Sequence, residues 1–176
     1  LDAGDVSAPL PETLPDPENP NLKFFPQVLT TCERTFEAAS EIVRQGRFPV
    51  FLGGDHSIAI GTIAAVAKPY VDRGERMGLI WFDAHGDANT PETTPSGNIH
   101  GMSLAVSLGF GDPDLVGLGG RHPKVQPRNT VLIGIRNLDA REKELVRASG
   151  VHVFTMKDID RLGIATVMLS CAHSCR

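Results

Sequence analysis

An apolar stretch that ends in an alternating row of polar residues constrains this chain more than any other feature. Residues 77–82 read M-G-L-I-W-F, and the following D-A-H-G-D puts Asp83, His85 and Asp87 at every second position. Side chains at such spacing share one face of an extended segment, and neighbouring carboxylates repel unless a cation separates them. Oxygen and imidazole ligands suit a divalent ion such as manganese or zinc. The stretch therefore predicts a strand ending in a metal site, with a solvated acidic loop as the alternative.

Short apolar segments alternate with segments of helical period along the rest of the chain. Strands are expected at residues 47–52, 77–83, 130–136 and 151–154, helices at residues 26–45, 58–67, 101–108, 140–149 and 156–169, and a loop at residues 110–127. Strands alternating with helices favour a parallel sheet that is covered on both faces. We therefore expect an α/β fold with three layers, αβα, and a mainly parallel sheet.

The chain divides into three parts. Residues 1–26 carry six prolines, which exclude regular helix and central strand, so they predict a surface arm or loop. Residues 27–168 hold the alternating elements and form the expected α/β domain. Residues 169–176 make an atypical tail.

Composition excludes several classes of partner. A net charge of -4 gives no electrostatic footprint for nucleic acid or for an anionic membrane. No stretch approaches the ~18 apolar residues of a membrane span, and the first residues lack the pattern of a signal peptide. Three cysteines are an odd number and too few for a disulfide scaffold. We therefore expect a cytoplasmic protein that binds neither nucleic acid nor a membrane.

Three of the expected strands end in polar motifs, namely G-G-D-H-S, D-A-H-G-D and R-N-L-D. Ligands of parallel sheets collect beyond the carboxyl ends of the strands, so these motifs are expected at one rim. This arrangement adds His56 and Asp139 to the candidate site. Gly53 and Gly54 could suggest a phosphate cradle, but neither nucleotide-binding glycine pattern is present, which leaves nucleotide binding as a weak alternative.

The motifs G-G-D-H-S, D-A-H-G-D-A-N-T-P and S-G-N-I-H-G-M resemble three successive blocks of the ureohydrolase family, at the spacing of its arginases. The resemblance continues through G-I-R-N-L-D and V-H-V-F-T-M-K-D-I-D-R-L-G-I and so covers most of the chain. It implies a site with two Mn²⁺ ions and the hydrolysis of L-arginine to L-ornithine and urea, in arginine catabolism or the urea cycle. It also implies that the parent protein is a homotrimer or homohexamer.

The same resemblance implies roles for the metal-site residues. His56 and Asp87 would bind one manganese, His85 would bind the other, and Asp83 would bridge both. Asp87 would also orient the nucleophilic hydroxide. His100 would shuttle protons, a role that suits an imidazole near neutral pH.

Substrate contacts are implied in the same way. Asn89, Ser96 and Asn98 would contact the carboxylate of the amino acid, Asp139 would hold its α-ammonium group, and His85 would lie beside the substrate. Simpler roles stay open. Asn and Ser are common turn formers, and Asp139 could have no role beyond capping the helix that follows it.

The resemblance breaks at both ends of the chain. The family pattern continues into an S-x-D-x-D block that supplies further metal ligands, whereas residues 167–176 read V-M-L-S-C-A-H-S-C-R. We therefore expect a truncated fold that is incomplete at both ends, with three protein ligands for one manganese and two for the other. Such a chain should bind manganese weakly and turn over arginine poorly. The alternatives are a ureohydrolase for agmatine or guanidinobutyrate, or a non-catalytic metal-binding fragment.

Overall fold

The centre of the molecule is a parallel sheet of three strands. The computed structural model describes residues 2–120 and 123–174. The strands are β1 (Leu79–Phe82), β2 (Thr130–Ile135) and β3 (His152–Thr155), in the order β1-β2-β3. Both pairings are parallel, as expected for strands that are joined by helical crossovers. The predicted α/β class with a mainly parallel sheet is therefore confirmed.

Helices and loops make up the rest of the described chain. The α-helices are α1 (Phe25–Arg44), α2 (Ile58–Asp72), α3 (Ser103–Ser107), α4 (Pro113–Gly117), α5 (Ala140–Ser149), α6 (Met156–Leu162) and α7 (Ile164–Ser174). Three short 3-10 turns are η1 (Pro11–Thr13), η2 (Ile99–Met102) and η3 (Pro127–Asn129). None of the helices in the described part of the chain is long and apolar enough to cross a membrane.

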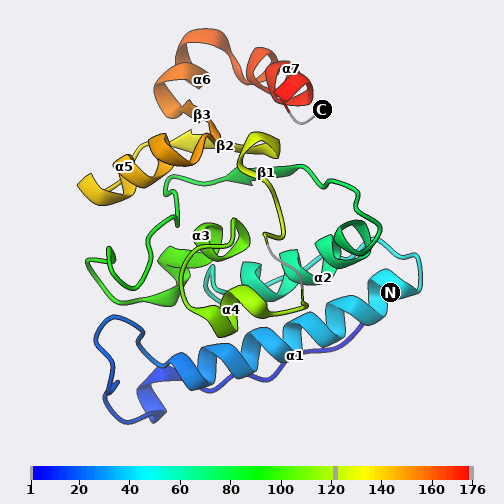
Figure 1. Ribbon diagram of the computed structural model, residues 1–176, viewed down its shortest axis with the longest axis vertical. Coiled ribbons are helices and arrows are strands. Elements are labelled where there is room, and N and C mark those ends of the chain that lie inside the picture. Colours follow the sequence, from blue (N-terminus) through cyan, green and yellow to red (C-terminus); the bar gives the residue numbers. More distant parts are fainter. Residues whose placement is uncertain (1, 121–122, 175–176) are drawn as a thin grey trace.

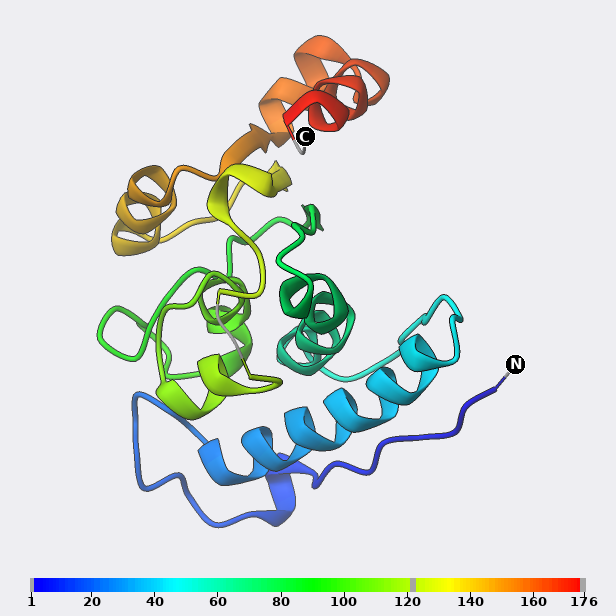
Figure 2. The same cartoon turned by 45° about the vertical axis from the view of Figure 1, so that its right-hand side comes forward.

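Side chains alternate across β2 and give each face of the sheet its own core. One face packs on α2, α3 and α5, through the cluster of Trp81, Leu132, Ala59, Leu104 and Val146. The opposite face packs on α7, through the cluster of Val131, Ile133, Val167 and Cys171. Figures 1 and 2 show α6 and α7 on one side of the sheet and α2, α3 and α4 on the other. The expected three layers are confirmed.

Helix α1 lies outside this arrangement and packs along α2 (Figures 1 and 2). The two helices approach closely at Gly61, where an added Cβ would lie 2.5 Å from the carbonyl oxygen of Cys32. Cys32 is buried in a second core cluster with Ile60, Ile99 and neighbours from α4. This cluster joins the outer helix to the segment that precedes α3.

One predicted strand does not form. Residues 47–52 are outside any strand, and Phe48, Val50 and Leu52 are 90%, 73% and 92% exposed. A strand needs a hydrogen-bonded neighbour, and in the described ranges none pairs with this segment or with the outer edge of β1. Ile80 and Phe82 on β1 are accordingly exposed as well. The apolar pattern of residues 47–52 predicted a buried strand, but it does not show whether a neighbouring strand is present to pair with it.

Other boundaries shift for local reasons. The loop predicted at residues 110–127 contains α4, which Asp112 caps by accepting from the backbone N–H of Asp114. The single helix predicted at residues 156–169 is two helices, separated by Gly163 at φ 78°. Most of residues 169–176 lie in α7, and residues 175–176 are outside the described ranges.

Candidate metal centre

The loop after β1 is held in place by its neighbour β2. Asp83 donates its backbone N–H to the carbonyl oxygen of Ile133, so the parallel ladder runs into the loop. Gly134 then takes φ 91° and shifts the register of β2, and an added Cβ there would lie 3.2 Å from the Asp83 carbonyl oxygen. Beyond this bulge, the backbone N–H groups of Arg136 and Asn137 both donate to the carbonyl oxygen of Ala84. The loop therefore starts from a fixed backbone.

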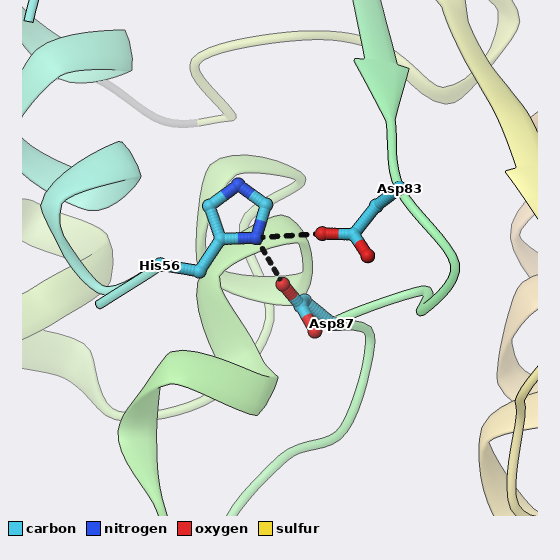
Figure 3. A group of neighbouring side chains, drawn as sticks. All are labelled: His56, Asp83 and Asp87. Carbon is cyan, nitrogen blue, oxygen red and sulfur yellow. Dashed lines mark ion pairs between the residues drawn. The ribbon is translucent and has the colours of Figure 1, made fainter. Parts of the chain in front are cut away.

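His56, Asp83 and Asp87 converge on one point, as Figure 3 shows. The Nδ1 atom of His56 lies 3.1 Å from Oδ2 of Asp83 and 2.6 Å from Oδ2 of Asp87. His56 comes from the loop before α2, Asp83 from the end of β1, and Asp87 from the loop that follows. Asp87 is buried at φ 48°, and its carbonyl oxygen accepts from the backbone N–H groups of Leu104 and Ala105.

The ring of His56 is fixed by a stacking contact with Trp81, at 4.3 Å between centroids and 24° between planes. Its carbonyl oxygen accepts from the Ser103 hydroxyl. The hydrogen bond to Asp87 raises the pKa of His56 above its usual value, against the lowering effect of burial, and the charges of both carboxylates act in the same direction. His56 therefore holds a proton more readily than a free imidazole does, and a cation that binds here has to displace that proton.

His85 lies on the other side of Asp83. Its ring Nδ1 is 3.1 Å from Oδ1 of Asp83, and its backbone N–H donates to the same oxygen. Burial works to raise the pKa of Asp83, but the hydrogen bonds from His85 and the charge of His56 outweigh it and hold the pKa below its usual value. The two carboxylate oxygens thus face two different histidines, which is the arrangement that a bridging ligand needs.

The donor set fits a divalent cation. One ligand atom from each of His56, Asp83 and Asp87 lies within 4.8 Å of the others, which is near the roughly 4 Å between ligands that share one ion. One imidazole and two carboxylates suit Mn²⁺ or Zn²⁺ and do not favour copper(I). For a second ion, the described residues offer His85 together with the shared Asp83.

A pocket of about 190 Å³ opens beside these residues. Its lining includes five of the predicted site residues, namely His85, Asp87, Asn89, Ser96 and His100. The ring of His100 is 46% exposed, with Nδ1 3.4 Å from Oδ2 of Asp55. The structure therefore brings two of the four predicted metal ligands and three of the five predicted substrate contacts to one cavity. The other two metal ligands, His56 and Asp83, lie next to it, in contact with Asp87 and His85.

Two predicted substrate contacts are not in the pocket lining. Asn98 donates its backbone N–H to the hydroxyl of Ser96 and so belongs to the same turn. Asp139 caps α5 by accepting from the backbone N–H of Glu142, and its other oxygen accepts from the side-chain amide of Asn89 at 2.7 Å. Asp139 thus makes the helix cap that the sequence allowed and also holds a residue of the pocket.

Glu142 lines the same pocket and was not identified from the sequence. Its side chain is 6% exposed, and Oε1 accepts from the backbone N–H of Ala88 at 3.1 Å. An added Cβ at Gly86 would lie 2.9 Å from this oxygen, so the loop packs directly on the carboxylate. Burial raises the pKa of Glu142, and the negative charges of Asp139 and Asp87 act in the same direction. One feature of the sequence could have identified Glu142. It is the third residue after the helix cap Asp139, a position where a glutamate often turns back towards the start of the helix.

Replacing Glu142 by leucine is expected to weaken Mn²⁺ binding about tenfold or more, because a group that supports a metal loop contributes on that scale. Glu142→Gln keeps an acceptor oxygen for the Ala88 N–H and should bind Mn²⁺ within about twofold of the parent chain. Isothermal titration with Mn²⁺ measures both. Equal losses in the two variants would show that the charge of Glu142, and not its hydrogen bond, matters.

Comparison with known proteins agrees with this geometry. The model of the Arginase family matches residues 1–175. The chain is 51% identical to the arginase of Bacillus caldovelox over 167 residues, which is 95% of this chain and 54% of that protein. It is 50% identical to the arginase of Brevibacillus brevis, with the same coverage.

Solved structures give the same result. The Bacillus caldovelox arginase superposes with a TM-score of 0.91 at 49% identity, over 98% of this chain and 56% of that one. The arginase of Entamoeba histolytica in complex with L-ornithine superposes with a TM-score of 0.85 at 31% identity, over 96% and 56%. The chain thus spans about half the length of the relatives it matches. Its matched sequence, its fold and its converging histidine and aspartates together make this chain a member of the arginase family.

Proposed function

We propose that the protein to which this chain belongs hydrolyses L-arginine to L-ornithine and urea, with two Mn²⁺ ions per site. The observation that carries the proposal is the position of Asp83 between two histidines. One carboxylate oxygen faces His56 at 3.1 Å and the other faces His85 at 3.1 Å. When bound, two such ions lower the pKa of a water molecule and so supply a nucleophile near neutral pH.

The residues of the chain have separate tasks in this proposal. His56, Asp83 and Asp87 hold one ion, and His85 and Asp83 contribute to the second. Asp87 also borders the pocket, where its carboxylate can orient a nucleophile towards the guanidinium carbon. The exposed ring of His100 lies at the pocket wall, where an imidazole can move protons between solvent and product.

We assign the amino acid end of the substrate to the part of the pocket that Asn89 and Ser96 line. Asn89 and Ser96 line the cavity and offer an amide and a hydroxyl to a carboxylate. Asp139 lies behind Asn89, with its pKa below the usual value because hydrogen bonds from Glu142 and Asn89 outweigh burial, which acts to raise it. We infer that Asp139 is negatively charged, as a partner for an α-ammonium group must be, and that Asn98 shapes the turn at Ser96.

Two other functions compete with this proposal. Agmatine and guanidinobutyrate each lack one of the two charged groups of an α-amino acid. A ureohydrolase for either would therefore not need both the carboxylate contacts of Asn89 and Ser96 and the ammonium contact of Asp139. A non-catalytic metal-binding fragment is favoured by the two-ligand position at His85. We further infer a cytoplasmic homotrimer or homohexamer for the whole protein, on the family resemblance alone.

With Mn²⁺ present, L-arginine is expected to bind this chain at least about tenfold more tightly than agmatine or guanidinobutyrate, since each charged contact contributes more than about 1.4 kcal/mol. Calorimetric titration of the three compounds measures the order, with urea release recorded in parallel. Equal affinity for the three would contradict L-arginine as the substrate, and binding without urea release would favour the non-catalytic alternative for this chain.

A further inference from the structure

The proline-rich arm contacts the loop at residues 94–98, which forms one wall of the pocket through Thr94, Pro95 and Ser96. The backbone N–H of Lys23 donates to the carbonyl oxygen of Gly97 at 2.9 Å. Gly97 is buried at φ 73°, and an added Cβ would lie 1.7 Å from the carbonyl oxygen of Pro20. The arm and the loop are therefore in backbone contact, at a distance and in a conformation that only glycine allows.

The contacting part of the arm is itself anchored. Leu22 packs against the second core cluster, which contains Ile99, one residue after the loop. The backbone N–H groups of Asn21 and Leu22 both return to Asn19, one to its side-chain oxygen and one to its carbonyl oxygen. Residues 20–23 are thus a turn fixed to the core on one side and to the loop on the other.

The hydrogen bonds that residues 94–98 make among themselves are local. The hydroxyl of Thr94 accepts from the backbone N–H groups of Ser96 and Gly97, and the hydroxyl of Ser96 accepts from the backbone N–H of Asn98. These bonds shape the turn but do not attach it to the sheet. Thr94, Pro95 and Ser96 nevertheless line the pocket, so their position sets its width.

We propose that residues 20–23 are a positioning element for the pocket wall made by Thr94, Pro95 and Ser96. The metal ligands are held separately, by β1, β2 and α3. Disturbing the arm should therefore move the wall that receives the substrate's amino acid end and leave the metal ligands in place. The part of this inference that concerns L-arginine rests on the proposed function.

Two variants test the inference from opposite sides of the contact. Leu22→Ala removes the anchor of the arm, and Gly97→Ala forces the two backbones apart. Leu10→Ala is the control for the first, because Leu10 lies in the same arm and its side chain is 65% exposed. Gly150→Ala is the control for the second, because Gly150 has φ 82° and open space around it.

Amide hydrogen exchange at residues 94–98 is the first measurement, and we expect exchange about tenfold faster in both variants and unchanged in both controls. Titration with L-arginine and with Mn²⁺ is the second. We expect L-arginine affinity about tenfold lower, since small displacements of a binding group have effects of that size, and Mn²⁺ affinity within about twofold.

The outcomes separate the two hypotheses. Exchange that stays unchanged at residues 94–98 overturns the positioning role, and so does a parallel loss of Mn²⁺ and L-arginine affinity, which would indicate general destabilisation. A parent chain that binds no L-arginine contradicts the proposed function, and the exchange measurement then still decides whether the arm holds the loop.

Discussion

Mn²⁺ affinity is expected to fall more than about 100-fold when His56 is replaced by alanine, because loss of a mere supporting group already costs roughly 10–100-fold. His56 supplies the nitrogen donor of the cluster, and its ring lies within 3.1 Å of both carboxylates. Without the imidazole, Asp83 and Asp87 face each other with no third ligand and repel. Isothermal titration with Mn²⁺, or the electron paramagnetic resonance signal of free Mn²⁺, measures the loss.

His152→Ala is the matched control, because His152 is an exposed histidine at the start of β3. It should bind Mn²⁺ as the parent chain does. The His56 variant also loses the stacking contact with Trp81, so its thermal unfolding must be measured alongside. Mn²⁺ binding that survives in the folded His56→Ala protein would show that the ion binds elsewhere.

The second large effect is expected on stability, at Gly61. An added Cβ would meet the carbonyl oxygen of Cys32 at 2.5 Å and the backbone nitrogen of Phe36 at 3.1 Å, so α1 would have to move away from α2. Alanine gains at most about 1 kcal/mol in helix propensity, whereas overpacking costs about 1–3 kcal/mol or more when backbone is displaced. We therefore expect Gly61→Ala to lower the free energy of unfolding by about 2 kcal/mol and Tm by roughly 5 °C.

Gly117→Ala is the control for this substitution. Gly117 is also helical, at the end of α4, and no atom lies within 4 Å of an added Cβ. Its thermal unfolding should match that of the parent chain or exceed it slightly. Equal Tm values for the two variants would show that α1 and α2 do not approach as closely as described.

The rim of the sheet could be predicted because its determinants are local. Asp83, His85 and Asp87 follow a strand at alternating positions, and the G-G-D-H-S motif adds His56. The parallel strands β1 and β2 then bring D-A-H-G-D and R-N-L-D to one edge. His56 reaches the same edge from the loop before α2, although the strand predicted at residues 47–52 does not form. The same reasoning placed β1, β2 and β3 within one or two residues.

Features that depend on distant contacts could not be predicted. Residues 47–52 have the composition of a buried strand, but a strand exists only with a partner, which composition does not encode. Glu142 belongs to a charged helix, and its burial comes from contact with the metal loop, 54 residues away, where its carboxylate accepts from the Ala88 N–H. The approach of Pro20 to Gly97 joins segments far apart in the sequence.

We infer that this member of the arginase family offers three ligands to one cation, namely His56, Asp83 and Asp87, and two to a second, namely His85 and Asp83. Titration of the chain with Mn²⁺, with bound ions counted per chain and urea release from L-arginine assayed in the same samples, tests the claim most directly. We predict one bound Mn²⁺ per chain, lost in His56→Ala, with little urea released. No Mn²⁺ binding, or two tightly bound ions with full turnover, would contradict it.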